Sequence, residues 1–154
     1  MLLILYLINK FTVPAAFVIN TDVHNLPGSH WVALYIDNKY TCYFFDSYGF
    51  PPLVTEHKQF IVKNTKKIIY NKTCLQSTET SVCGHYCSVF VLLMCRKIKF
   101  NTVISRLNLK NKYDNDANII ILYARFFSKN KSGGRRSKSC SLNSQCCVRK
   151  PNCK

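Results

Sequence analysis

The chain of 154 residues is long enough to bury one hydrophobic core, and a composition of 47% hydrophobic and 13% aromatic residues excludes a disordered protein. The formal net charge of +15 is uneven, because residues 128–154 hold eight Lys and Arg residues and no acidic ones. A basic surface and tail favour polyanionic partners such as DNA. A solvated basic tail without a partner is the alternative.

The apolar residues at the N-terminus indicate neither a membrane span nor a secretion signal. The run in residues 1–9 is too short to cross a bilayer and lacks a basic leader and a small-residue cleavage site. We read it as part of a strand or helix, and we expect an intracellular protein, in the nucleus or cytoplasm, that does not bind membranes. In that setting the nine cysteines should be mostly free thiols.

Three segments in the first third of the chain have the composition of β-strands. Residues 15–20 read as a buried strand, and residues 30–36 and 40–46 are rich in aromatic and β-branched residues. The turn-forming residues 37–39 join the last two segments, which predicts a β-hairpin. Both faces of the hairpin are apolar, so we expect central strands covered on both sides.

The rest of the chain reads as mainly helical. Apolar residues recur at helical spacing after Cys83, which predicts a buried helix that begins at this cysteine. Gly, Ser and basic residues after Phe127 are typical of a flexible tail. We therefore expect one domain over residues 1–127 and a tail over 128–154. Within the domain we expect, in chain order, a helix over 53–64, a short strand over 66–71, the buried helix over 83–97, and one or two helices over 101–127.

The predicted hairpin brings a histidine and a carboxylate together. If residues 37–39 form a three-residue loop, Ile36 lies opposite Tyr40, and His30 lies opposite Asp46 on the same face, with Cβ atoms roughly 5 Å apart. An acid beside the imidazole would orient the ring and stabilise its charged form. A slip by one residue would place the two side chains on opposite faces. The alternative is a histidine and an aspartate at strand ends with no shared role.

Cys83 and Gln76 add a nucleophile and a hydrogen-bond donor. Cys83 begins the predicted helix, where free backbone N–H groups and the helix dipole favour the reactive thiolate. Gln76 precedes it by seven residues on a loop, where its amide could donate to an oxyanion together with the Cys83 N–H. His30, Asp46, Gln76 and Cys83 therefore supply a base, its orienting acid, an oxyanion donor and a nucleophile for acyl transfer. Read alone, Gln76 would be an ordinary loop residue, and Cys83 a small buried apolar one.

Other clusters of Cys and His predict no metal site and no cofactor. Cys83, His85 and Cys87 are spaced two residues apart on a helix, so their side chains point in different directions. Cys87 and Cys95 read as buried helix residues, and His85 reads as a bystander. We expect His24 and His57 at the surface. The cysteines of the tail lack the spacing of a zinc site: Cys140, Cys146, Cys147 and Cys153.

Three stretches resemble a known family: "GSHWVALYID", "YFFDSYGFPP" and "LQSTETSVCGHYC". They are similar to the adenovirus-type cysteine proteases (adenains), especially the relatives in adenovirus-like viruses and Maverick/Polinton transposons, in a superfamily that includes the SUMO-specific proteases. The resemblance runs from about Ala15 to Phe127. It implies an α+β fold related to papain, with a mixed central sheet and the nucleophile at the N-terminus of a buried helix. It also implies His30 as general base, Asp46 as its orienting acid, Gln76 as oxyanion donor and Cys83 as nucleophile.

The resemblance has two departures. Only 29 residues precede His30, fewer than is usual in the family, so we expect an N-terminally truncated copy, such as a transposon remnant. The basic tail with cysteines is not part of the family pattern. Its sequence "GGRRSKSC" is similar to the basic, cysteine-containing peptide that stimulates the adenovirus enzymes together with DNA, but an ordinary extension is the alternative.

By resemblance, the chain would be a thiol endopeptidase. It would cleave viral or transposon capsid precursors near Gly-Gly or Gly-x sites, as a monomer without a cofactor, and it would belong to the virion if virus-derived. A protease of SUMO or other ubiquitin-like proteins is one alternative. An inactive basic remnant that binds nucleic acid is the other.

Overall fold

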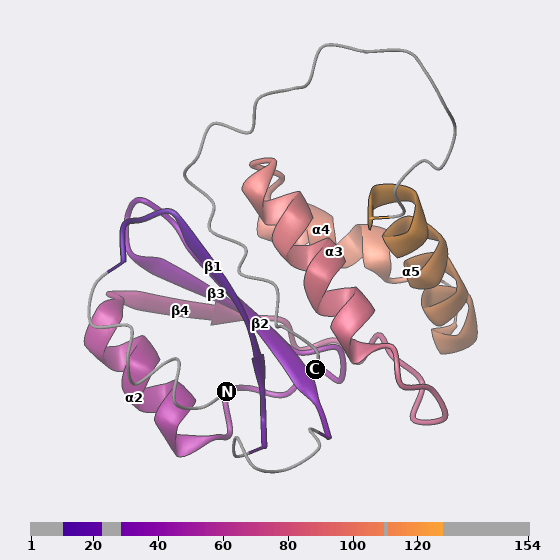
Figure 1. The fold of residues 1–154 in the computed structure, drawn as a ribbon, viewed down its shortest axis with the longest axis horizontal. Coiled ribbons are helices and arrows are strands. Elements are labelled where there is room, and N and C mark those ends of the chain that lie inside the picture. The colour runs from indigo at the N-terminus through magenta and orange to yellow at the C-terminus, as the bar shows by residue number, and fades with distance from the viewer. Residues whose placement is uncertain (1–10, 23–28, 110, 128–154) are drawn as a thin grey trace.

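The computed structural model describes residues 11–22, 29–109 and 111–127, which form one mixed sheet covered by helices on both faces (Figure 1). The strand order is β1-β2-β3-β4, with antiparallel pairs β1/β2 and β2/β3 and a parallel pair β3/β4. This arrangement confirms the predicted α+β class and mixed sheet. The strands are β1 (Ala15–Asn20), β2 (Trp31–Ile36), β3 (Thr41–Phe45) and β4 (Lys67–Tyr70), and the helices are α2 (Thr55–Asn64), α3 (Cys83–Cys95), α4 (Phe100–Leu107) and α5 (Lys112–Phe127).

The two faces of β2 pack into two separate cores, as predicted from a strand that is apolar on both faces. One face packs against α2, and its core includes Val32, Leu34 and Ile36. The other face packs against α3 and the helices that follow it, and its core includes Ala33 and Tyr35. Since α3 is covered by the sheet on one side and by α4 and α5 on the others, its sequence is apolar nearly all round.

The hairpin register differs from the prediction by two residues. Ile36 pairs with Cys42, not with Tyr40. The loop still has three residues, but these are 38–40 instead of 37–39. Asp37 pairs with Thr41 where the loop begins and ends, and Tyr40 takes a left-handed backbone conformation with φ of 60°. The Asp37 side chain stabilises this turn by accepting hydrogen bonds from the N–H groups of Lys39 and Thr41. A shift of two residues preserves the faces of the strand.

One histidine is buried that we predicted at the surface. His57 is 1% exposed on the inner side of α2, where it contacts the backbone of Asn20, and its Nε2 has no partner in the described part of the chain. The prediction was wrong because the inner face of α2 takes residues at positions i, i+3 and i+4, and His57 is the first of these: His57, Phe60 and Ile61. Burial lowers the pKa of His57.

Several predictions fall on residues outside the described ranges. These are the strand or helix over residues 1–9, the position of His24, and the tail with its cysteines. They stay predictions. Within the described residues, no helix has the length and apolar character that crossing a membrane requires.

Candidate active site

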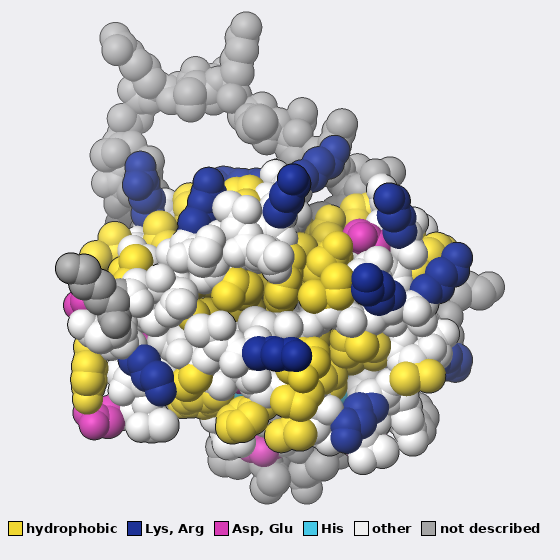
Figure 2. Space-filling view, turned by 180° about the vertical axis from the view of Figure 1, so that it is seen from behind, with side chains coloured by type: hydrophobic (Ala, Val, Ile, Leu, Met, Phe, Trp, Pro, Cys, Tyr) yellow, Lys and Arg dark blue, Asp and Glu magenta, His cyan; other side chains and the backbone are white. Residues whose placement is uncertain are grey.

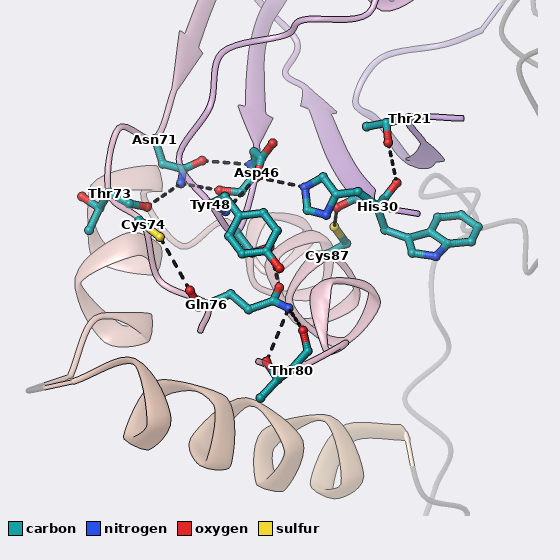
Figure 3. A network of polar contacts seen from close by, with 12 residues as sticks. Thr21, His30, Asp46, Tyr48, Asn71, Thr73, Cys74, Gln76, Thr80 and Cys87 are labelled. Atoms are coloured by element: carbon teal, nitrogen blue, oxygen red, sulfur yellow. Dashed lines mark hydrogen bonds and ion pairs between the residues drawn. The ribbon is translucent and has the colours of Figure 1, made fainter. Parts of the chain in front are cut away.

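His30, Asp46 and Cys83 come from three different elements and meet at one end of the sheet. His30 lies directly before β2, Asp46 directly after β3, and Cys83 is the first residue of α3. The His30 Nε2 atom lies 3.0 Å from Asp46 Oδ1, as Figure 3 shows. The ring also hydrogen-bonds to the Cys83 thiol. Because Asp46 occupies Nε2, the nitrogen left for the sulfur is Nδ1.

The pairing of His30 with Asp46 survives the register shift for a geometric reason. In the observed register the residue opposite His30 would be Tyr48, two positions beyond Asp46. The Tyr48 ring does lie against the imidazole, with ring centroids 5.0 Å apart. Asp46 is the diagonal neighbour on the same face, and this offset is within reach of a histidine side chain. The predicted contact is present, although the predicted direct opposition is wrong.

Asp46 is 4% exposed and its orientation is fixed by its neighbours. The Tyr48 N–H donates to Oδ1 over 2.7 Å, so this oxygen serves both His30 and the backbone. The Asn71 side chain pairs with the main chain of Asp46, accepting from its N–H over 3.0 Å and donating to its carbonyl over 2.7 Å. Asn71 therefore extends the β3/β4 pairing beyond the strand ends. Although Asn71 begins an N-glycosylation sequon, it is only 3% exposed.

The Asp46–Gly49 turn requires a glycine at its last position. The Gly49 N–H donates to the Asp46 carbonyl over 2.9 Å, and Gly49 has a φ of +81°. A Cβ there would lie 2.8 Å from the carbonyl carbon of Thr73. The glycine thus allows the turn to lie directly on the segment that leads to Gln76.

The pKa of His30 is strongly raised. Burial alone would lower it, but the hydrogen bonds to Asp46 and Cys83 and the negative charges of both outweigh burial and raise the pKa from 6.5 to about 9. The His30 side chain is 16% exposed. Near neutral pH the ring is therefore held as an imidazolium.

The pKa of Cys83 moves in the opposite direction. Burial alone would raise it, since the residue is 7% exposed, but the hydrogen bond to His30, the backbone N–H groups of Trp31 and Gly84, and the His30 charge lower it. Val82, the residue before α3, makes no side-chain cap, so N–H groups of the first turn remain free to act on the sulfur. His30 and Cys83 therefore favour an imidazolium–thiolate pair.

The other thiols lack this environment. Burial raises the pKa of Cys42 to about 12 and raises that of Cys87 well above its ordinary value. Cys87 Sγ lies 3.2 Å from the Trp31 carbonyl, and the His85 ring packs edge-on against Tyr123, with centroids 4.4 Å apart. Cys83, His85 and Cys87 thus have three different sets of neighbours. Among the described residues, no group of three or more Cys, His, Asp or Glu side chains could hold a metal ion.

Gln76 lies on the loop before α3, as predicted, and is buried there. It is 1% exposed, and its Oε1 accepts a hydrogen bond from the Ser47 hydroxyl over 2.8 Å. Its Nε2 donates to the Thr80 carbonyl over 2.7 Å. The Ser47 carbonyl also accepts from the N–H groups of Leu75 and Gln76. Successive residues therefore position two different groups, Asp46 the imidazole and Ser47 the amide.

Several supporting residues were missed from the sequence: Ser47, Tyr48, Asn71, Thr80 and Asp116. Tyr48 and Ser47 could have been found, because they follow Asp46 in a turn whose glycine fixes its shape. Asn71 and Asp116 carry no local signal, since each acts across 25 or more residues of sequence.

Comparison with known proteins gives a similar sequence and a similar solved structure. No family model matches the chain. A protein of Acanthamoeba polyphaga mimivirus that is named as a thiol protease is 33% identical over 100 residues, covering 58% of this chain and 33% of that protein. A crystal structure of a protease of ASFV aligns with 68% of this chain and 42% of its own, with a TM-score of 0.45 and 23% identity. The chain thus spans about a third of the length of its curated relative.

Proposed function

We propose that the chain is a cysteine endopeptidase in which Cys83 is the nucleophile, His30 the general acid and base, and Asp46 the group that orients His30. The observation that carries the proposal is the meeting of His30, Asp46 and Cys83 at the start of α3, with His30 Nε2 3.0 Å from Asp46 Oδ1. The raised pKa of His30 and the lowered pKa of Cys83 agree with this geometry. The similarity to a mimivirus protein named as a thiol protease supports the same activity.

The reaction follows from the charges of the pair. The Cys83 thiolate attacks the scissile carbonyl carbon, a C–S bond forms, and the carbonyl oxygen becomes an oxyanion. The imidazolium of His30 then gives its proton to the leaving amine as the C–N bond breaks, which leaves an acyl-enzyme. The neutral His30 next takes a proton from water, whose oxygen attacks the thioester. Release of the carboxylic product restores the thiolate and the imidazolium.

The oxyanion would be stabilised at the first turn of α3 and by Gln76. The Cys83 N–H belongs to the first turn of the helix, and no described residue accepts a hydrogen bond from it. Gln76 Nε2 donates to the Thr80 carbonyl over 2.7 Å and lies 3.5 Å from the Thr80 hydroxyl oxygen. We assign the second N–H, whose contact with Thr80 is the longer one, to the oxyanion. Because Ser47 fixes Oε1, the amide group cannot flip.

For the substrate we propose capsid precursor proteins of a virus or transposon, cut near Gly-Gly or Gly-x sites. The resemblance of "SVCGHYC" and the seven-residue interval between Gln76 and Cys83 to the adenovirus-type enzymes favour this class over ubiquitin-like proteins. Such an enzyme would act as a monomer in the nucleus, cytoplasm or virion.

Two substrates separate these classes. We expect the protein to cleave fluorogenic peptides that carry Gly-Gly before the scissile bond, and to leave a SUMO precursor intact. Efficient processing of the SUMO precursor, with poor cleavage of the peptides, would instead assign the chain to ubiquitin-like substrates.

DNA binding is a second candidate function, supported by the net charge of +15. Figure 2 shows Lys and Arg side chains spread over one face among hydrophobic ones, with few acidic side chains. A basic surface of this kind binds nucleic acid through counterion release, so its affinity should fall steeply with salt. Salt-dependent DNA affinity without thiol reactivity at Cys83 would favour an inactive binding protein over the peptidase.

The profile of kcat/KM against pH should be bell-shaped, with its alkaline limb near pH 9. As the pH rises through the raised pKa of His30, the imidazolium loses its proton and can no longer protonate the leaving amine. Asp46→Asn removes the negative charge that helps to raise this pKa, so the alkaline limb should move to lower pH while reduced activity remains. The measurement is kcat/KM between pH 5 and 10 for both proteins. An unmoved limb would show that Asp46 does not act through His30.

A further inference from the structure

Asp116 is a buried carboxylate on α5 that the triad does not use. It is 4% exposed and accepts three hydrogen bonds from different parts of the chain. Its Oδ2 accepts from the Ser77 N–H over 3.1 Å and from the Thr80 hydroxyl over 2.7 Å. Its Oδ1 accepts from the Tyr86 hydroxyl over 2.9 Å. A carboxylate buried to this degree needs such donors, because an unpaired one would cost several kcal/mol.

The three donors lie on the two elements that form the site. Ser77 and Thr80 belong to the loop that carries Gln76, and the Thr80 carbonyl is the group that holds the Gln76 amide. Tyr86 lies on α3, three residues after Cys83, and is fully buried. Asp116 therefore joins the Gln76 loop to the nucleophile helix at one point. The residue before it supports the same loop, since Asn115 Nδ2 donates to the Leu75 carbonyl over 2.8 Å.

We propose that Asp116 is a positioning residue that holds the Gln76 loop against the first turns of α3, so that Gln76 is set in place for the oxyanion. This inference rests on the proposed peptidase function. Asp116 acts through Thr80, which orients the Gln76 amide, and through Tyr86, which ties the same carboxylate to α3.

The role has a specific kinetic signature. Formation of the Cys83 thiolate depends on His30 and on the backbone N–H groups of Trp31 and Gly84, and Asp116 is not among its causes. Stabilisation of the oxyanion depends on the loop that carries Gln76. This stabilisation acts only when the carbonyl carbon of the substrate becomes tetrahedral. Loss of Asp116 should therefore lower kcat, while KM for a peptide and the alkylation rate of Cys83 stay near their wild-type values.

The test compares Asp116→Ala, Asp116→Asn and Thr80→Val in the full chain, with Asp114→Ala as the matched control. Asp114 is exposed on the same helix and hydrogen-bonds to Asn111, away from the loop. Kinetics use a Gly-Gly fluorogenic peptide, alkylation uses iodoacetamide, and hydrogen exchange follows the Ser77 amide. Thr80→Val keeps the shape of the side chain and removes only the hydroxyl. It therefore tests the contact between Thr80 and Asp116 even if Asp116→Ala does not fold.

We expect Asp116→Ala to lower kcat by about 10- to 100-fold, with KM and alkylation within about twofold of wild type. Thr80→Val should act in the same direction. Asp116→Asn should recover part of the loss, because an amide oxygen can accept from both Ser77 and Thr80 while its N–H₂ faces the rotatable Tyr86 hydroxyl. Exchange of the Ser77 amide should be faster in Asp116→Ala and unchanged in Asp114→Ala.

Wild-type kcat in both Asp116→Ala and Thr80→Val would overturn the inference. So would an alkylation rate that falls in step with kcat, since that would place the effect on the thiolate. If the wild-type protein shows no turnover that depends on Cys83, the proposed function itself fails. Hydrogen exchange at Ser77 then decides alone whether Asp116 holds the loop, and unchanged exchange in Asp116→Ala would reject it.

Discussion

Replacing Cys83 with alanine should abolish peptidase turnover, with kcat falling by about 10⁵-fold or more, because its sulfur is the attacking group of the proposed mechanism. The Cys42 and Cys87 thiols have raised pKa values and are fully buried. Removal of the sulfur takes away one partner of His30 but leaves its contact with Asp46 in place. The measurement is turnover of the Gly-Gly fluorogenic peptide at pH 7, with the melting temperature as a check on folding.

Cys95→Ala is the matched control for this substitution. Cys95 is the last residue of the same helix, at the opposite end from Cys83, and it is only partly buried. It should therefore retain turnover close to that of the wild-type protein. Turnover that persists in Cys83→Ala would remove this residue from the mechanism, whatever its pKa.

His30→Ala should be nearly as damaging, with kcat/KM reduced by about 10⁴-fold. The substitution removes the proton donor for the leaving amine and the base for the attacking water. It also removes the hydrogen bond and the positive charge that lower the pKa of Cys83, so the thiolate becomes scarce at neutral pH. Two separate measurements check these consequences, peptide turnover and the rate at which iodoacetamide alkylates Cys83 at pH 6.

His85→Ala is the control for His30. It lies two residues after the nucleophile in sequence, but its ring packs against Tyr123 on α5 rather than against the sulfur. We expect turnover within a few-fold of wild type. If His85→Ala lost activity as His30→Ala does, while the alkylation rate in His30→Ala stayed high, the base would have been assigned to the wrong histidine.

The strands and helices were predictable because each carries its own periodic signal. The apolar run of β2 and the helical spacing of apolar residues in α3 place these elements to within a few residues. Which face of the hairpin a residue occupies follows from the two-residue period of a strand. The exact register did not follow, because it depends on Tyr40 adopting a left-handed backbone that local side chains stabilise. The contact of His30 with Asp46 was predicted, since a shift of two residues leaves both on one face.

The residues that support the site could not be predicted from local sequence patterns. Asp116 reaches Ser77 across 39 residues, and Asn71 reaches Asp46 across 25. Such contacts depend on how α5 and β4 dock on the rest of the fold, which no periodicity encodes. His57 shows the same limit, because it was predicted at the surface and the packing of α2 buries it. The sequence placed Gln76 on a loop but carried no sign that it is buried, since loop residues are usually exposed.

The central claim is that Cys83 exists as a thiolate paired with His30 at a pH where ordinary thiols are protonated. Brief treatment of the wild-type protein with iodoacetamide at pH 6, followed by peptide mass spectrometry, tests it directly. An ordinary cysteine is only about 0.3% ionised at this pH, so the thiolate at Cys83 should dominate the labelling. We predict rapid alkylation of Cys83 with Cys74 and Cys95 largely unlabelled. Labelling of Cys83 no faster than that of Cys74 and Cys95 would contradict the account.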